Sequence, residues 1–208
     1  MPLFISPKLN LLFVLSTLLF CSNYTFASPF YVGGYIGKST IHDDNFFDQL
    51  SNGKDVDYTN TNYSFLAGIA LKQGFLLELE AGSIHSYVAK SPLSFSYEEL
   101  SIENNYLRIN LLQTFPLPGN FNWYLKESLG MISAKQSYTN ATGLIEKQEK
   151  TNALYPGLSV GIQQEFFYHR KKISTYLEIQ YSGYNLKNDD NTYHIRLNSF
   201  GAGIKWKF

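Results

Sequence analysis

The sequence is poor in cysteine and methionine, and its charges balance. Its single cysteine is Cys21, inside the first 27 residues. The rest of the chain therefore has no disulfide, no thiol nucleophile and no thiolate metal site. With 17 basic and 17 acidic residues, there is no basic surplus of the kind that nucleic-acid binding requires, so we expect no nucleic-acid partner. After residue 27 no apolar run approaches about 18 residues, which excludes a transmembrane helix.

The first 27 residues have the pattern of an export signal. Lys8 is their only charge, an apolar run extends from Leu9 to Phe20, and small residues around Ala27 provide a cleavage site. We therefore predict that residues 1–27 are a cleaved signal peptide and that residues 28–208 form one domain. The alternative is a lipoprotein signal acylated at Cys21, but such signals carry a small residue where Phe20 stands.

From Phe30 onward the sequence alternates with a period of two, which indicates strands with two unlike faces. Long polar loops are expected at about 42–61, 89–99, 137–151 and 186–192, alternating with short turns. This alternation is typical of outer-membrane barrels. The eight predicted strands cover about 30–41, 62–72, 75–88, 100–115, 121–136, 152–166, 173–185 and 193–208.

The residues on the two faces of each strand predict a barrel in lipid. Phe200, Ala202 and Ile204 share one face of the last strand, and Lys205 and Lys207 share the other. Turned towards lipid, each mid-membrane basic residue would cost roughly 2–4 kcal/mol, so the charges should face the lumen. We therefore predict an all-β, eight-stranded, antiparallel up-and-down transmembrane β-barrel. A soluble sandwich with its apolar faces inward is the alternative.

Two positions conflict with simple alternation. Glu127 falls on the lipid-facing side of its strand, so either a β-bulge shifts the phase there or the register is different. Ile195 and Leu197 are out of step with Phe200, which suggests a second phase change near Ser199.

Several segments resemble the OmpA-like small outer-membrane barrel superfamily, which includes opacity-type, porin-like surface proteins. The chain ends in NSFGAGIKWKF at 198–208, and FYVGGYIGKS at 30–39, the strand–turn–strand unit at 105–130 and YLEIQYSGYNL at 176–186 are also similar. The resemblance implies insertion into the bacterial outer membrane, among its lipids and lipopolysaccharide. It further implies that the barrel-assembly machinery recognises the terminal strand, through Ile204, Trp206 and Phe208.

The charged residues of the predicted lumen are the first candidate site. Four of them fall at similar heights, and all should pair because an eight-stranded lumen holds little solvent. The group acts either as a plug that keeps the lumen closed or as a gate that opens a narrow path. Its members are Glu78, Glu80, Arg108, Lys126 and Glu178.

Catalysis and metal binding have weaker support. Some barrels of this size edit lipid A with a His and a Ser two positions apart, but the comparable stretch here places Gln180 before Ser182. Glutamine cannot act as a general base, so we expect no catalytic residues and no cofactor. Five aspartates lie near the first long loop, where Ca²⁺ binding and a simple solvated loop are the two alternatives. They are Asp43, Asp44, Asp48, Asp55 and Asp57.

The sequence thus predicts a non-enzymatic surface barrel, with a host or environmental ligand contacted through the long loops. A lipid A-modifying enzyme and a narrow gated channel remain the alternatives. A wide pore is not expected, because side chains fill an eight-stranded interior.

Overall fold

The computed structural model describes residues 30–43, 56–71, 74–90, 99–140, 144–168, 171–188 and 191–208. The predicted signal peptide and the tips of the predicted long loops lie outside these residues. No helix among them is long and apolar enough to cross a membrane.

The described residues form ten antiparallel strands. Eight make a closed ring in the order β4-β3-β1-β10-β9-β8-β6-β5, which the pairing of β5 with β4 completes. The strands are β1 (Phe30–His42), β2 (Val56–Asp57), β3 (Thr59–Ala70), β4 (Phe75–Lys90), β5 (Glu99–Pro116), β6 (Phe121–Thr139), β7 (Ile145–Leu154), β8 (Gly157–Tyr168), β9 (Lys171–Asn188) and β10 (Asn191–Lys207). The predicted all-β, up-and-down fold is confirmed.

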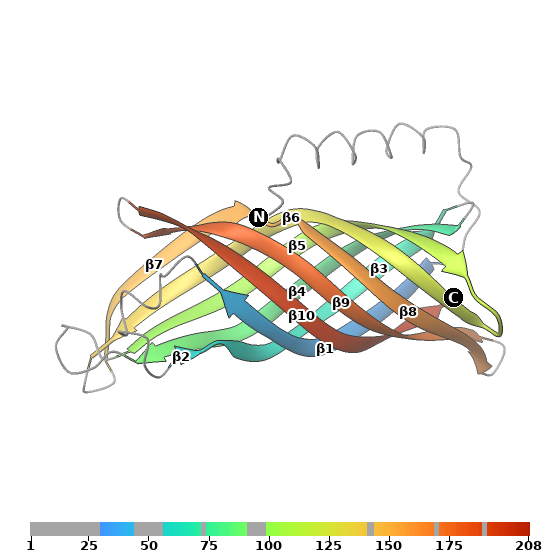
Figure 1. The fold of residues 1–208 in the computed structure, drawn as a ribbon, viewed down its shortest axis with the longest axis horizontal. Coiled ribbons are helices and arrows are strands. Elements are labelled where there is room, and N and C mark those ends of the chain that lie inside the picture. Colours follow the sequence, from blue (N-terminus) through green and yellow to red (C-terminus); the bar gives the residue numbers. More distant parts are fainter. Residues whose placement is uncertain are drawn as a thin grey trace, which may run out of the picture.

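All eight ring strands are tilted in the same sense (Figure 1). The chain end Phe208 and the turns after β3, β5 and β8 share one end of the ring, which we call the short-turn end. The opposite end, where β2 and β7 lie, is the long-loop end. The two-residue β2 pairs with β4, and β7 extends the position of β8 alongside β6.

The strands are longer than the sequence suggested. The predicted loop at about 137–151 is mostly a hairpin, since β6 continues to Thr139 and β7 begins at Ile145. Similarly, β9 and β10 extend to Asn188 and from Asn191, where a loop was predicted. These extensions were missed because they are rich in charged and polar residues, and even the inward side of β7 carries Lys147, Glu149 and Thr151.

The predicted phase change near Ser199 is wrong. The pairing of β10 with β1 runs without a shift from Lys207 to Arg196. Leu197 is fully buried inside the ring, whereas Phe200, on the opposite face of the strand, is 59% exposed. The alternation of β10 therefore keeps its phase. What changes between Phe200 and Leu197 is the apolar face, which points outward at Phe200 and inward at Leu197.

Glu127 likewise requires no bulge. The register of β6 against β5 is continuous along the whole strand, and Glu127 faces outward opposite Leu111 and Leu158. A shift does occur in β4, between Ile84 and Tyr87. Ile84 and Tyr87 are both buried although they are three positions apart. The bulge shifts the alternation of β4 by one residue, so that both apolar side chains face the inside of the ring.

Candidate functional site

Arg108 and Glu80 form a buried two-point ion pair in the middle of the ring. They are cross-strand partners on β5 and β4, and both are at most 2% exposed. The Arg108 Nη2 donates to Glu80 Oε1 at 2.7 Å, and Nε donates to Oε2 at 3.0 Å. The guanidinium lies over the rings of Tyr106 and Tyr155, at 4.9 and 5.9 Å from their centroids. Such a fixed, two-point pair is a strong charge-assisted interaction.

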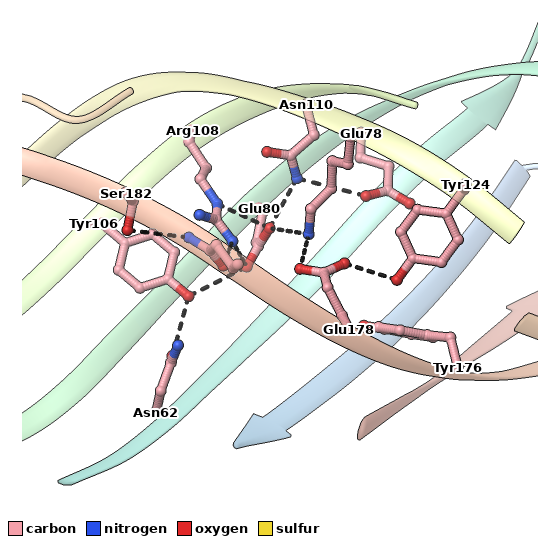
Figure 2. Close-up of polar contacts among 12 residues, drawn as sticks. Asn62, Glu78, Glu80, Tyr106, Arg108, Asn110, Tyr124, Tyr176, Glu178 and Ser182 are labelled. Atoms are coloured by element: carbon pink, nitrogen blue, oxygen red, sulfur yellow. Dashed lines mark hydrogen bonds and ion pairs between the residues drawn. The ribbon is translucent and has the colours of Figure 1, made fainter. Parts of the chain in front are cut away.

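Lys126 connects this pair to a second carboxylate, that of Glu178, which is labelled with Glu80 and Tyr124 in Figure 2. Its ammonium contacts Glu178 directly and lies 3.8 Å from Glu80 Oε2. Tyr124 donates a hydrogen bond of 2.8 Å to the other Glu178 oxygen. The structure therefore brings together the four charged residues that the sequence placed at similar heights.

Glu78 belongs to a separate ion pair with Lys205. Lys205 contacts Glu78 directly, and Tyr31 donates to the same carboxylate oxygen at 2.9 Å. The Lys205 ammonium also lies within 5.0–5.7 Å of the ring centroids of Tyr31, Tyr124 and Tyr176. Sequence analysis placed Lys205 on the polar face of its strand but gave it no partner, because the cross-barrel contact depends on ring closure.

Two neutral amides, Asn110 and Gln180, complete the network, and neither was predicted to belong to it from the sequence. Asn110 donates to Glu80 Oε2 at 2.8 Å, and Gln180 accepts from Arg108 Nη2 at 3.0 Å. Arg108 therefore meets Gln180 and not Glu178, which Lys126 neutralises. The network contains three buried acids and three buried bases, so it has no net formal charge.

Glycines make room for the tyrosines that surround these charges. A Cβ atom added to Gly82, Gly161 or Gly203 would lie 2.2–2.4 Å from a tyrosine ring. Each glycine is the direct cross-strand partner of the tyrosine it accommodates. These glycines thus let large aromatic rings lie across the lumen. The pairs are Gly82–Tyr106, Gly161–Tyr124 and Gly203–Tyr176.

Apolar side chains seal the charges on the long-loop side. Ile41, Ile84, Ile102, Ile195 and Leu197 are all fully buried there and belong to one contiguous cluster, which we call the upper core. The charged faces of the strands were predicted to point into the lumen, and the upper core corrects this for the long-loop side, where apolar side chains point inward. Around the Glu78–Lys205 pair lies a second cluster, which includes Leu66, Leu76, Leu112 and four tyrosines.

The remaining predicted residues lie away from this network. Ile204 and Trp206 face outward on β10, and Phe208 closes the ring through a 2.9 Å backbone hydrogen bond to the Phe30 carbonyl. Recognition of these three by the assembly machinery stays a prediction. Gln180 and Ser182 face the lumen, 3.4 Å apart, and Ser182 donates to the Tyr155 hydroxyl at 2.9 Å.

The first long loop, for which calcium binding and a solvated loop were the two alternatives, lies largely outside the described residues. Asp44, Asp48 and Asp55 lie outside the described residues. Within the described part of the chain, no three His, Cys, Asp or Glu side chains come together in a way that could hold a metal ion.

Comparison with known proteins gives one family match and several structural ones. The family model of the outer membrane protein beta-barrel domain matches residues 11–208. No curated protein matches the sequence. Neisserial surface protein A is 12% identical in the aligned part, which covers 86% of this chain and 97% of that one, with a TM-score of 0.61.

Two further structures are more distant. The attachment invasion locus protein Ail of Yersinia pestis, solved with a heparin analogue, is 12% identical over 87% of this chain and 99% of its own, with a TM-score of 0.49. The N-terminal barrel domain of Pseudomonas aeruginosa OprF is 12% identical over 88% and 100%, with a TM-score of 0.46. At these identities the likeness to Neisserial surface protein A shows the fold alone.

Proposed function

This chain belongs to the outer membrane protein β-barrel family, and from that premise we propose that it is a closed, non-enzymatic barrel that carries a rigid binding platform above the outer membrane. Short turns of such barrels face the periplasm and long loops face the exterior. The long-loop end of the ring is then the extracellular end. A host or environmental ligand would be contacted there.

The observation that carries this proposal is the filled lumen. Three acids and three bases neutralise one another inside the ring, and the upper core lies between them and the extracellular end. An ion crossing this barrel would have to separate buried ion pairs and also pass through the buried side chains of the upper core. Eight strands leave an interior that side chains just fill, which supports a plug rather than an open path.

The upper core also supports the proposal of a rigid binding platform. Beyond the lipid-facing band, strands such as the 19-residue β6 continue, and their inward apolar side chains belong to the upper core. Apolar burial gives this extension its own packing energy. It would hold the loops at fixed positions, which lowers the entropic cost of binding a partner.

A lipid A-modifying enzyme is less well supported. Gln180 and Ser182 are buried in the lumen and not on the surface that lipid can reach. Hydrolysis also needs a group that accepts a proton near neutral pH, and an amide does not. We therefore expect lipid A from cells expressing the protein to have the same mass spectrum as lipid A from cells lacking it, and a new acyl pattern would favour the enzyme.

The gated channel is supported by one specific observation. Arg108 Nη1, Asn110 Oδ1 and the hydroxyls of Ser128 and Ser159 are buried without a hydrogen-bond partner among the described residues. Buried polar atoms of this kind usually bind internal water, and a chain of waters could begin there.

Conductance across a planar bilayer separates the plug from the gate. We expect the purified full-length protein to produce no stable current steps at any moderate voltage. A double variant, Ile41→Ala with Leu197→Ala, thins the upper core and serves as the positive comparison. Reproducible, ion-selective steps from the unaltered protein would refute the plug.

A further inference from the structure

The first half of β7 is an open sheet edge. Strand β7 pairs with β6 along its length, and among the described residues no ladder joins its other edge to any strand. Strand β9 ends at Asn188, and near that end the Thr151 hydroxyl of β7 donates to the Lys187 carbonyl at 3.1 Å. The start of β7 lies apart from the β9–β10 hairpin in Figure 1. An open edge of this kind is a template for pairing with another strand.

The backbone of this edge directs hydrogen-bonding groups away from β6 at every second residue. The Tyr155 amide donates to the Gly130 carbonyl of β6 at 2.8 Å, so Tyr155 directs its groups towards β6. These groups alternate between the two sides along a strand. Gln148 and Lys150 therefore direct theirs away from β6, and their side chains are exposed. A neighbouring strand would find donors and acceptors at these two residues.

The charge pattern of the edge is complementary to itself. Residues 146–150 read EKQEK, so reversing this run replaces every charge by the opposite one. Lys147 and Glu149 lie on one face of β7, with Nζ and Oε1 2.6 Å apart. In an antiparallel pair centred on Gln148, Lys147 of one copy would lie opposite Glu149 of the other, and opposite charges at such positions are stabilising. The two Gln148 residues would exchange their backbone hydrogen bonds.

The same charges disfavour the neighbouring registers. Moving the centre by one residue would place Glu149 opposite Glu149, or Lys147 opposite Lys147, and like charges directly opposite each other are destabilising. Charged residues on an exposed edge usually prevent pairing with other strands. On this edge they prevent it except in the one arrangement centred on Gln148.

We propose that β7 pairs with β7 of a second copy of this chain, antiparallel and centred on Gln148. Such a contact uses the same surface on both copies, which a two-fold axis relates. This axis is perpendicular to the barrel wall and so parallel to the membrane, which makes the partner barrel point in the opposite direction. The two barrels then lie in two membranes whose outer surfaces face each other. The contact would attach one cell to another cell that carries the same protein.

One contact of this kind is weak. A strand edge of a few residues buries far less surface than the roughly 1,200–2,000 Å² of a stable interface. Many copies on two facing surfaces would act together, because each contact raises the effective concentration for the next. The protein should therefore be monomeric in dilute detergent solution and should associate across facing membranes. The inference rests on the proposed extracellular position of the long-loop end.

Clustering of vesicles that contain the purified protein tests this proposal. Refolding into preformed zwitterionic lipid vesicles keeps the long loops outside, because polar backbone crosses a bilayer poorly. Half of the vesicles carry a donor dye and half an acceptor dye, and we expect energy transfer between them. Gln148→Pro removes an N–H that β6 does not use and should slow clustering by about tenfold or more. Gln148→Ala keeps this N–H and should cluster like the unaltered protein.

A charge exchange tests the register. Lys147→Glu and Glu149→Lys each place like charges opposite each other, so vesicles carrying either variant alone should not cluster. Vesicles carrying the first should cluster with vesicles carrying the second, because opposite charges then face each other again. The matched controls are Lys38→Glu and Glu103→Lys, which make the same changes at exposed positions on β1 and β5. Each control variant should cluster with itself.

Three results would overturn the pairing of β7. They are an absence of clustering by the unaltered protein, clustering of Gln148→Pro vesicles at the unaltered rate, and failure of the two charge variants to cluster with each other. Heat-modifiable migration on a gel verifies that each variant is folded. A vesicle preparation that neither clusters nor conducts would contradict this pairing and leave the closed barrel proposed above intact, so the two failures are distinguishable.

Discussion

The short-turn half and the long-loop half of this barrel use the same strands with opposite polarity. In the short-turn half of β10, Phe200 and Ile204 face outward and Lys205 faces the lumen. In the long-loop half of the same strand, Ile195 and Leu197 face inward and Arg196 faces outward. One half is arranged for lipid outside, the other for water outside. The difference shows that alternation fixes which residues share a face, while the surrounding solvent fixes which face is apolar.

A substitution in the lumen of the short-turn half should cause the largest loss in the free energy of unfolding. Arg108→Ala would leave the buried Glu80 carboxylate with Lys126, 3.8 Å away, as the nearest cation, and removing one partner of a buried pair costs about 3–5 kcal/mol. Urea titration of the protein in lipid vesicles, followed by the shift in gel mobility, measures this loss in the free energy of unfolding.

The double variant Glu80→Leu with Arg108→Leu is the matched comparison for that experiment. It removes both charges and should recover most of the stability, because buried pairs can often be replaced by apolar residues at little cost. If the single and double variants lost equal amounts, charge pairing would not be the reason for the loss.

The upper core of the long-loop half gives the next largest effect. Leu197 is fully buried, so Leu197→Ala should destabilise the barrel by about 2–4 kcal/mol through lost burial and the cavity left behind. Its exposed neighbour Asn198 provides the control, since Asn198→Ala should change stability by no more than about 0.5 kcal/mol. The same urea titration measures both.

Similar effects at Leu197 and Asn198 would mean that the long-loop half has no packed interior. The contrast between the two halves would then fail, and the platform proposed above would lose its support.

The strands of the ring could be predicted because the period-two alternation of each strand is visible in its own stretch of sequence. The strand Phe121–Thr139 was expected from about 121 to 136, and most other strands were placed as closely. The strand ends were missed where the apolar face moved inside. A run such as Ile145–Leu154, with four charged residues, is typical of a loop unless its inner face is known to be covered.

Most residues of the charge network were predicted from the sequence, but their pairing was not. Alternation alone placed Glu80, Arg108, Lys126 and Glu178 in the lumen. The choice of Gln180 rather than Glu178 beside Arg108, and of Lys205 beside Glu78, depends on how strands far apart in sequence meet after closure. That information lies in the shear of the ring and not in any one strand.

Glu127 breaks the rule for the outside of the short-turn half, and it gives the smallest expected effect. Its side chain faces outward between Leu111 and Leu158, and its Oε2 has no hydrogen-bond partner among the described residues. A carboxylate at this level costs less than a basic residue, for which the mid-membrane penalty is roughly 2–4 kcal/mol. Glu127→Leu should therefore stabilise the barrel by about 1 kcal/mol in the urea titration, and Glu127→Gln by less, because the amide remains polar. A loss of stability in Glu127→Leu would mean that this carboxylate has a favourable partner in the membrane, so that the outer surface of the short-turn half is not uniformly adapted to lipid.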